Sequence, residues 1–336
     1  MLADLVSGFP SYVDLLARVR RGERPVVAGA GGALPGILLA ALARDLGRPL
    51  AIVVPDEKAS ESLTGDLVAA GVSRVFHAPA PTLTPYQRIP PSLKARRDEF
   101  GLLSALREPA SVRAVVLPAR SLFARLPSPE IFGGLLLSLS QGEEISLPRF
   151  VARLTAVGYR RSDLVVETGD LAVRGGLFDV FAPDRDLPVR VELDGDRVAS
   201  IRVFDPDTQR SRERLESVVL PPFAVARESD EEREMLTERL GRYPSEVERV
   251  VFAPAVSPMP ANWLDHAAGA VLAVLEPAAV DEEIAGFADR LAADRDPDRD
   301  PFLPEELAHP ADRIRDAISG AAVRFDRLGL TGDRSL

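Results

Sequence analysis

The 336-residue sequence predicts an α/β protein: a parallel-sheet domain that carries an inserted small α+β lobe. Three observations support this. Short apolar runs alternate with amphipathic segments over residues 1–122, the order typical of a parallel sheet buried on both faces. From 123 to 212 the runs instead alternate apolar and polar residues, as in antiparallel strands with one solvent face. The α/β pattern returns over 213–326, and 327–336 is expected to be a tail or linker.

Each element of the first domain is predicted from its apolar pattern. The expected helices are 10–20, 36–46, 57–70 and 93–107, and the expected strands are 25–28, 50–54, 74–77 and 114–117. Residues 78–91 are too rich in proline for either element, so they are expected to form a loop outside the sheet.

The lobe is predicted to contain a helix near 147–157 and three strands, at 172–181, 189–193 and 198–204. In the second strand Val189, Val191 and Leu193 fall on one face, while Arg190 and Glu192 fall on the other. The Asp-Gly-Asp sequence at 194–196 predicts a tight hairpin turn. The polar face, which also carries Arg202, reads as solvated.

The last third is predicted to contain strands at 250–252 and 270–275, a helix at 278–293 and a charged, proline-broken loop at 294–301. We expect the α/β domain to resume here. Within this part, residues 228–316 hold 22 Asp and Glu against 9 Lys and Arg. Because phosphate neutralisation supplies most non-specific affinity for nucleic acid, this acidity predicts little DNA binding.

A glycine-rich segment has the spacing of a phosphate-binding P-loop. Gly31 and Gly36 occupy the glycine positions between an apolar run and a helix-like run. Ile37 stands where the motif has its lysine, and Leu38 where it has serine or threonine. Without the groups that neutralise phosphate charge and hold Mg²⁺, the loop is interpreted as a degenerate nucleotide site with no ATP hydrolysis. The alternative is a turn that is glycine-rich only for close packing.

Composition excludes several classes of site. The chain has no cysteine and three scattered histidines, so neither a thiolate nor a histidine-rich metal site is expected, and no cofactor is predicted. The first residues lack a basic leader segment, and no run approaches the roughly 20 apolar residues of a membrane span. These features predict a cytoplasmic protein without a membrane partner.

Several blocks of the lobe carry a family resemblance. Residues 158–163, 166–181, 188–193 and 201–210 resemble, in order and spacing, the UvrB-homology module of bacterial nucleotide excision repair. Two families carry this module, the UvrB damage-verification helicase and the transcription-repair coupling factors. The missing P-loop lysine at Ile37 and the short loop at 79–91, too short for the DNA-inserting hairpin of the helicase, favour the coupling factors. Residues 301–307 also resemble that family.

The resemblance implies that the lobe recruits UvrA. By motif position, Arg161, Arg174 and Glu192 are the expected polar contacts. Phe178 is the expected apolar contact, with a core position as the alternative. Arg160 is the alternative to Arg161, because a slip of one residue would exchange their directions.

The implied function is a non-catalytic, UvrA-recruiting module that acts in transcription-coupled nucleotide excision repair. The full-length family is an ATP-dependent DNA translocase. Its motor and its RNA-polymerase-binding domain are expected to be absent from these 336 residues, so RNA polymerase and DNA would be bound only by those other domains. The alternative is a fragment of a divergent, UvrB-like nucleotide-dependent helicase.

Overall fold

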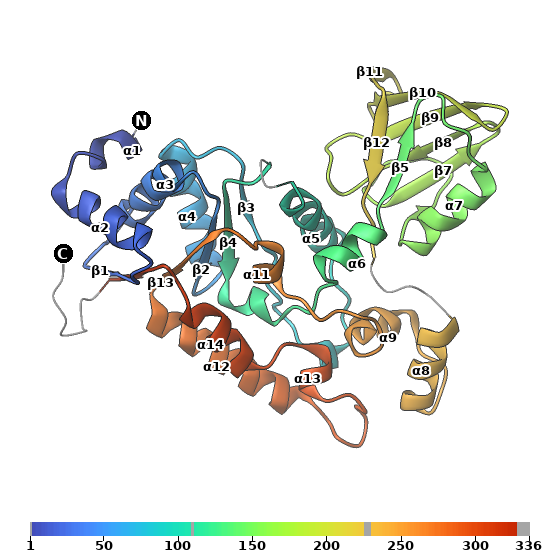
Figure 1. Cartoon of the computed structure of the whole chain (residues 1–336). Coiled ribbons are helices and arrows are strands. Elements are labelled where there is room, and N and C mark those ends of the chain that lie inside the picture. Colours follow the sequence, from blue (N-terminus) through green and yellow to red (C-terminus); the bar gives the residue numbers. More distant parts are fainter. Residues whose placement is uncertain (1, 109–110, 225–229, 328–336) are drawn as a thin grey trace. The chain divides into compact units, whose positions relative to one another are not determined.

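The chain forms two compact units in the computed structural model, which describes residues 2–108, 111–224 and 230–327 (Figure 1). The first unit consists of residues 1–87, 105–126 and 260–336, and the second of 88–104 and 127–259. Helix α5 (Leu93–Leu106) lies mainly in the second unit.

The first unit is built on a six-stranded parallel sheet. In spatial order the strands are β1 (Val26–Ala28), β14 (Val323–Asp326), β13 (Val271–Leu275), β2 (Leu50–Val54), β4 (Ala114–Pro118) and β3 (Val75–His77). Every residue of β2 and β4 is buried, which is why their sequences read as unbroken apolar runs. The predicted α/β fold with a parallel sheet is confirmed.

Helices cover both faces of this sheet. One face packs against α2 (Pro10–Arg20), α3 (Leu34–Leu46) and α4 (Glu57–Ala69), whose apolar side chains share one core with the strands. On the other face α12 (Pro277–Asp294) packs against the 3₁₀ helix η3 (Ala119–Phe123) and against α14 (Ala311–Ser319). The rings of Phe123 and Phe287 lie 4.8 Å apart there. The unit also contains α1 (Leu2–Val6), η1 (Pro85–Gln87), α11 (Trp263–His266) and α13 (Pro304–Leu307).

The second unit contains a six-stranded, mainly antiparallel sheet. In spatial order its strands are β11 (Ser211–Leu215), β10 (Arg197–Phe204), β9 (Val189–Asp194), β8 (Leu177–Val180), β7 (Asp170–Arg174) and β6 (Arg160–Arg161), and only β6 pairs in parallel. A second sheet joins β5 (Leu137–Ser140) to β12 (Ser217–Leu220). Helix α7 (Leu147–Ala156) and both sheets enclose the core. The remaining helices are α6 (Pro129–Gly134), α8 (Asp230–Leu240), α9 (Glu246–Val251) and α10 (Ala253–Val256).

Two predicted strands are wrong. The run 172–181 is a hairpin of β7 and β8, because Gly175, with a φ of +57°, turns the chain and Arg174 pairs with Leu177. The run 250–252 belongs to helical structure: the Ser245 and Glu248 side chains form a capping box that starts α9. Short strands β5, β12 and β14 were not predicted.

The second unit extends beyond the lobe expected from the sequence. The predicted lobe ran from 123 to 212, whereas residues 213–259 also group with this unit in the structure. Strand β12 explains part of the difference, because it pairs with β5 and contributes Val218 and Leu220 to the same core. Most of the predicted tail, residues 328–336, lies outside the described residues. Across the ranges that the structure describes, no helix is both long and apolar enough to span a bilayer.

A buried carboxylate fixes the start of α9. Glu248 is almost fully buried, and its Oε1 and Oε2 accept hydrogen bonds from the Arg242 guanidinium at 2.6 and 2.9 Å. The Ser245 backbone N–H and hydroxyl also donate to it, at 3.0 and 2.9 Å, and Arg88 Nε lies 3.2 Å away. These donors, led by Arg242, lower the pKa of Glu248 to about 2.

The depressed pKa predicts an acid-sensitive contribution to stability. Because the folded-state pKa lies below the unfolded value, the contribution is full above pH ~4.5 and is lost as the pH falls toward 2. We expect Glu248→Gln to lower the free energy of unfolding by about 2–3 kcal/mol at pH 7, and by less as the pH approaches 3. Urea denaturation between pH 3 and 7 measures the difference in free energy of unfolding between wild type and the variant. Glu246→Gln, at an exposed neighbour, is the control. A difference in unfolding free energy that does not change with pH would contradict the lowered pKa of Glu248.

Candidate functional site

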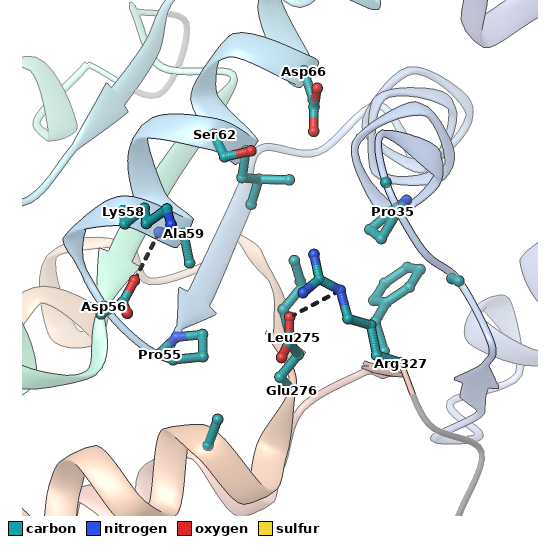
Figure 2. A pocket seen from close by; sticks show the side chains of 15 residues that line it. Pro35, Pro55, Asp56, Lys58, Ala59, Ser62, Asp66, Leu275, Glu276 and Arg327 are labelled. Atoms are coloured by element: carbon teal, nitrogen blue, oxygen red, sulfur yellow. Dashed lines mark hydrogen bonds and ion pairs between the residues drawn. The ribbon is translucent and has the colours of Figure 1, made fainter.

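A cavity of about 410 Å³ lies at the carboxyl edge of the parallel sheet, where α/β proteins commonly bind ligands (Figure 2). It is formed by residues that follow or end β1, β2, β13 and β14, together with the first turns of neighbouring helices. Its polar lining residues are Asp56, Lys58, Ser62, Asp66, Glu276 and Arg327.

Three charged residues of this cavity, Asp56, Glu276 and Arg327, are engaged with the protein itself. The Asp56 carboxylate caps α4 by accepting the Ala59 backbone N–H at 2.8 Å, and Arg327 Nε lies 3.5 Å from Glu276 Oε1 (Figure 2). An anion would compete with the Asp56 side chain for the positive end of α4. Three acidic side chains line the space together with the two basic side chains of Lys58 and Arg327, so the lining offers a phosphate group no excess of positive charge.

Ala30, Gly32 and Pro35 of the glycine-rich loop line this cavity, but the four motif positions Gly31, Gly36, Ile37 and Leu38 do not. Gly31 precedes α3, and Gly36, Ile37 and Leu38 lie in its first turns. Leu38 is buried in the core and Ile37 packs against it, and neither lines the cavity. Among the described residues, no group of three or more His, Asp or Glu side chains is placed to hold a metal ion.

Gly36 has a packing role that the motif spacing did not reveal. A Cβ atom at this position would lie 2.6 Å from the Cβ of Asp66, so α3 and α4 approach too closely for any larger residue. A Cβ at Gly31 would meet no heavy atom within 4 Å. Close helix packing, the alternative considered for the glycine-rich turn, therefore accounts for Gly36.

This difference predicts that alanine destabilises the fold at Gly36 and has little effect at Gly31. We expect Gly36→Ala to lower the free energy of unfolding by about 1–2 kcal/mol, since overpacking costs more than the gain in helix propensity. Gly31→Ala, its matched control, should change stability by less than ~0.5 kcal/mol. Urea denaturation of both variants measures the contrast. Equal stabilities would show that α3 and α4 separate at little cost.

The second candidate site is one face of the sheet in the second unit. Strand register places Arg174 of β7 beside Leu177 of β8, Leu177 beside Glu192 of β9, and Glu192 beside Ser200 of β10. These four residues share the face opposite the α7 core, which we call the outer face. Adjacent strands are ~4.8 Å apart, so Arg174 and Glu192 are separated by roughly 10 Å across the sheet.

Arg174 is the most available cation of the outer face. Its side chain is exposed, and one guanidinium N–H donates to the Asp163 backbone oxygen at 2.7 Å. The side chain forms no further hydrogen bond or ion pair with the described residues, so the remaining guanidinium donors stay available. The single anchor orients the guanidinium before a partner binds.

The structure distinguishes between Arg160 and Arg161. Register pairs Arg160 with Asp170 and Arg161 with Leu171, a core residue. Alternation therefore places Arg160 on the outer face with Arg174, and Arg161 on the opposite side of the edge strand. Arg160 donates to Asp170 at 2.8 Å, whereas Arg161 is exposed and makes no side-chain bond with the described residues.

Glu192 is partly exposed on the outer face. The Ser200 hydroxyl donates to its Oε2 at 2.7 Å, and Arg202 lies 3.6 Å from the same oxygen. The pair with Arg202 lies near solvent, so the carboxylate can exchange it for a partner at modest cost, whereas the bond from the buried Ser200 hydroxyl orients the carboxylate.

The expectation that Phe178 is an apolar contact is wrong, because the structure buries this side chain. The side chain is fully buried and its ring lies 5.6 Å from that of Phe150 on α7. Strand alternation places Phe178 with Val180 on the core side, so a partner could not reach it in this conformation. Phe178 therefore occupies a core position, the alternative that the sequence left open.

Arg190 is also engaged internally. Its Nε and Nη2 donate to the two carboxylate oxygens of Asp179 at 2.7 and 2.8 Å, and its guanidinium lies 4.5 Å from the centre of the Phe204 ring. Asp179 is fully buried, and its hydrogen bonds raise the pKa of the Arg190 guanidinium. Arg190, expected on a solvated face, is therefore a structural residue.

Sequence reasoning missed an apolar feature beside Arg174. Leu164 and Val166 are 40% and 50% exposed, on the segment whose Asp163 carbonyl anchors Arg174. The run Leu164–Val165–Val166 reads as buried, and no local signal shows that only its central residue enters the core.

Comparison with known proteins defines the class of the second unit. The family model described as the UvrB interaction domain matches residues 137–224, which hold β5 to β12 and the outer face. The residues that carried the sequence resemblance fall largely inside this match.

Relatives of this chain include transcription-repair-coupling factors, to which it is similar over part of its length. The chain is 33% identical over 229 residues to the transcription-repair-coupling factor of Myxococcus xanthus, covering 66% of this chain and 19% of that protein. It is 30% identical over 231 residues to that of Mycobacterium bovis, with 66% and 18% covered, and 28% identical over 205 residues to that of Escherichia coli, with 61% and 18% covered. These matches confirm the similarity to the UvrB-homology module of transcription-repair-coupling factors. The chain spans about a fifth of the length of these relatives.

Proposed function

We propose that this chain is a non-catalytic module that recruits UvrA for transcription-coupled nucleotide excision repair. The observation that carries the proposal is the coincidence of the UvrB interaction domain match, residues 137–224, with a sheet face that presents Arg174 and Glu192 to solvent. An exposed guanidinium pairs well with carboxylates at protein interfaces, and arginine is enriched among residues that dominate binding energy.

The proposed surface consists of Arg174 and Glu192 on the outer face, with Arg160 at its edge. Arg161 remains a proposed contact only for a partner that wraps around the edge strand β6, since its register turns it away from Arg174. We place the proposed UvrA-binding lobe within the second unit, which differs from the predicted bounds 123–212. RNA polymerase and DNA are not proposed partners of this chain.

The first unit is proposed to be a degenerate nucleotide-binding fold that serves as a scaffold. Ile37 and Leu38 take the places of the phosphate-binding lysine and the Mg²⁺-binding hydroxyl, and both pack with the core instead of lining the cavity. Catalytic phosphate transfer depends on positioned charges, which this loop does not provide. The alternative is a nucleotide-dependent helicase fragment.

Two measurements test the proposal. Calorimetric titration of the whole chain with purified UvrA should show saturable binding that UvrB competes away. Thermal melting with millimolar Mg-ATP should show no shift, because a ligand stabilises a protein by RT ln(1 + [L]/Kd) only when it binds the folded state. Failure to bind UvrA would refute the recruiting function, and an ATP-dependent shift would support the alternative.

A further inference from the structure

The segment that borders Arg174 is held rigidly by its own contacts. In this segment, residues 163–168, the side chain of Val165 is fully buried and packs with Ala172, Phe181 and Phe204. These four residues form a small apolar cluster on the outer side of the sheet, separate from the α7 core. The packing of Val165 thereby holds the middle of the segment against Ala172 of β7, Phe181 and Phe204.

Hydrogen bonds fix the segment on both sides of Val165. The nearly buried Asp170 carboxylate accepts the backbone N–H groups of Val166 and Glu167 at 3.2 and 2.9 Å. The Ser162 hydroxyl donates to the Leu164 carbonyl at 2.8 Å. The backbone is therefore ordered before any partner arrives, so binding does not have to order it.

The fixed segment displays two apolar side chains to solvent. Leu164 is 40% and Val166 is 50% exposed, one on each side of the buried Val165. Exposed aliphatic side chains are ordinary when isolated, but this pair lies on a rigid support, and the Asp163 carbonyl of the same segment accepts the Arg174 guanidinium. The buried core of an interface is more apolar than the surrounding surface, and arginine is enriched at interfaces, so an aliphatic pair beside an orientated guanidinium is suited to burial by a partner.

We infer that Leu164 and Val166 form the apolar contact of the UvrA-binding surface, the part that Phe178 was expected to supply. The inference rests on the proposed function. The complementary surface of UvrA would present an apolar patch with a carboxylate beside it, so that the patch covers Leu164 and Val166 while the carboxylate pairs with Arg174. Continuity with Arg174 and Glu192 selects this partner over a second copy of the chain.

The two parts of the surface differ in their response to salt. Pairing of Arg174 with a carboxylate is screened as ionic strength rises, whereas removal of apolar side chains from water is not weakened by salt. The contribution of Leu164 and Val166 is therefore expected to persist at high salt, where the contribution of Arg174 shrinks.

The test is calorimetric titration of the whole chain with UvrA at about 0.1 and 0.5 M NaCl, using the double variant Leu164→Ala/Val166→Ala. We expect binding about 10- to 30-fold weaker than wild type at both salt concentrations. The matched control is Val219→Ala, since Val219 on β12 is 45% exposed in the same unit and lies outside the segment. It should bind as wild type does, and melting curves of all three proteins should coincide.

The outcomes separate the inference from the proposed function. If wild type binds UvrA and the double variant binds equally well, the inference is wrong and the recruiting function stands. If wild type does not bind UvrA, both fail. If Val219→Ala weakens binding as much as the double variant, the apolar contact is not specific to this segment. Sedimentation that shows a wild-type dimer lost in the double variant would assign the contact to a second copy instead. Val166→Thr, nearly equal in shape, should reproduce part of the loss if the double variant melts early.

Discussion

Replacing Arg174 with alanine should weaken binding of UvrA by on the order of 2 kcal/mol, about thirtyfold in Kd, and leave the fold intact. The exposed guanidinium is already orientated by the Asp163 carbonyl, so little conformational entropy opposes its pairing with a partner carboxylate. Folding is spared because the side chain contributes one hydrogen bond to a backbone oxygen and lies outside the core. Calorimetric titration and thermal melting measure the two quantities.

The matched control for this prediction is Arg153→Ala. Arg153 is an exposed arginine on α7, which packs on the opposite side of the sheet. It should bind UvrA as wild type does. A loss of about 0.5 kcal/mol or less for Arg174→Ala would place this residue on a wet rim and remove it from the centre of the proposed surface.

Replacing Asp179 with alanine should lower the free energy of unfolding by about 3 kcal/mol, the largest stability effect expected on this sheet. The variant leaves the Arg190 guanidinium, only 17% exposed, without its counter-charge and without two hydrogen bonds. The contact with the Phe204 ring does not replace the lost carboxylate, because a cation–π contact is weaker than a buried bidentate ion pair.

Urea denaturation with two further variants locates the cause. Arg202→Ala, on the neighbouring strand β10 and paired with Glu192 near solvent, should cost about 0.5 kcal/mol or less. The double variant Asp179→Leu/Arg190→Met should recover most of the loss, since apolar residues of similar volume often replace a buried ion pair. If the double variant is as unstable as Asp179→Ala, the loss of stability comes from altered packing and not from the unpaired charge of Arg190.

The sequence predicted those parts of the fold whose signals are local. The unbroken apolar runs of β2 and β4 indicated a sheet buried on both faces, and the Asp-Gly-Asp turn at 194–196 indicated the hairpin of β9 and β10. The hairpin of β7 and β8 was missed although Gly175 and Gly176 offered a local signal. Strand β14 was missed because its four residues form a strand only through pairing with β1 and β13.

The candidate surface could be predicted only in part. Alternation within one strand divides its residues between two faces but does not show which face packs against the core. Alternation separated Phe178 from Leu177 correctly, but the packing of α7 decides that Phe178 points inward. The pairing of Arg160 with Asp170 and of Arg190 with Asp179 depends on register between strands. Residues chosen by motif position therefore included one core aromatic and one arginine turned away from the others.

The Asp56 carboxylate at the start of α4 gives the first unit a built-in ligand. Being covalently part of the chain, it is present at a fixed and high effective concentration that dilution or metabolism cannot change. A soluble anion at that helix end has to displace it, whatever the energy status of the cell. The start of α4 is therefore occupied by the chain itself at every anion concentration, whereas the start of α3, where Ala33 provides no side-chain cap, is not closed in this way.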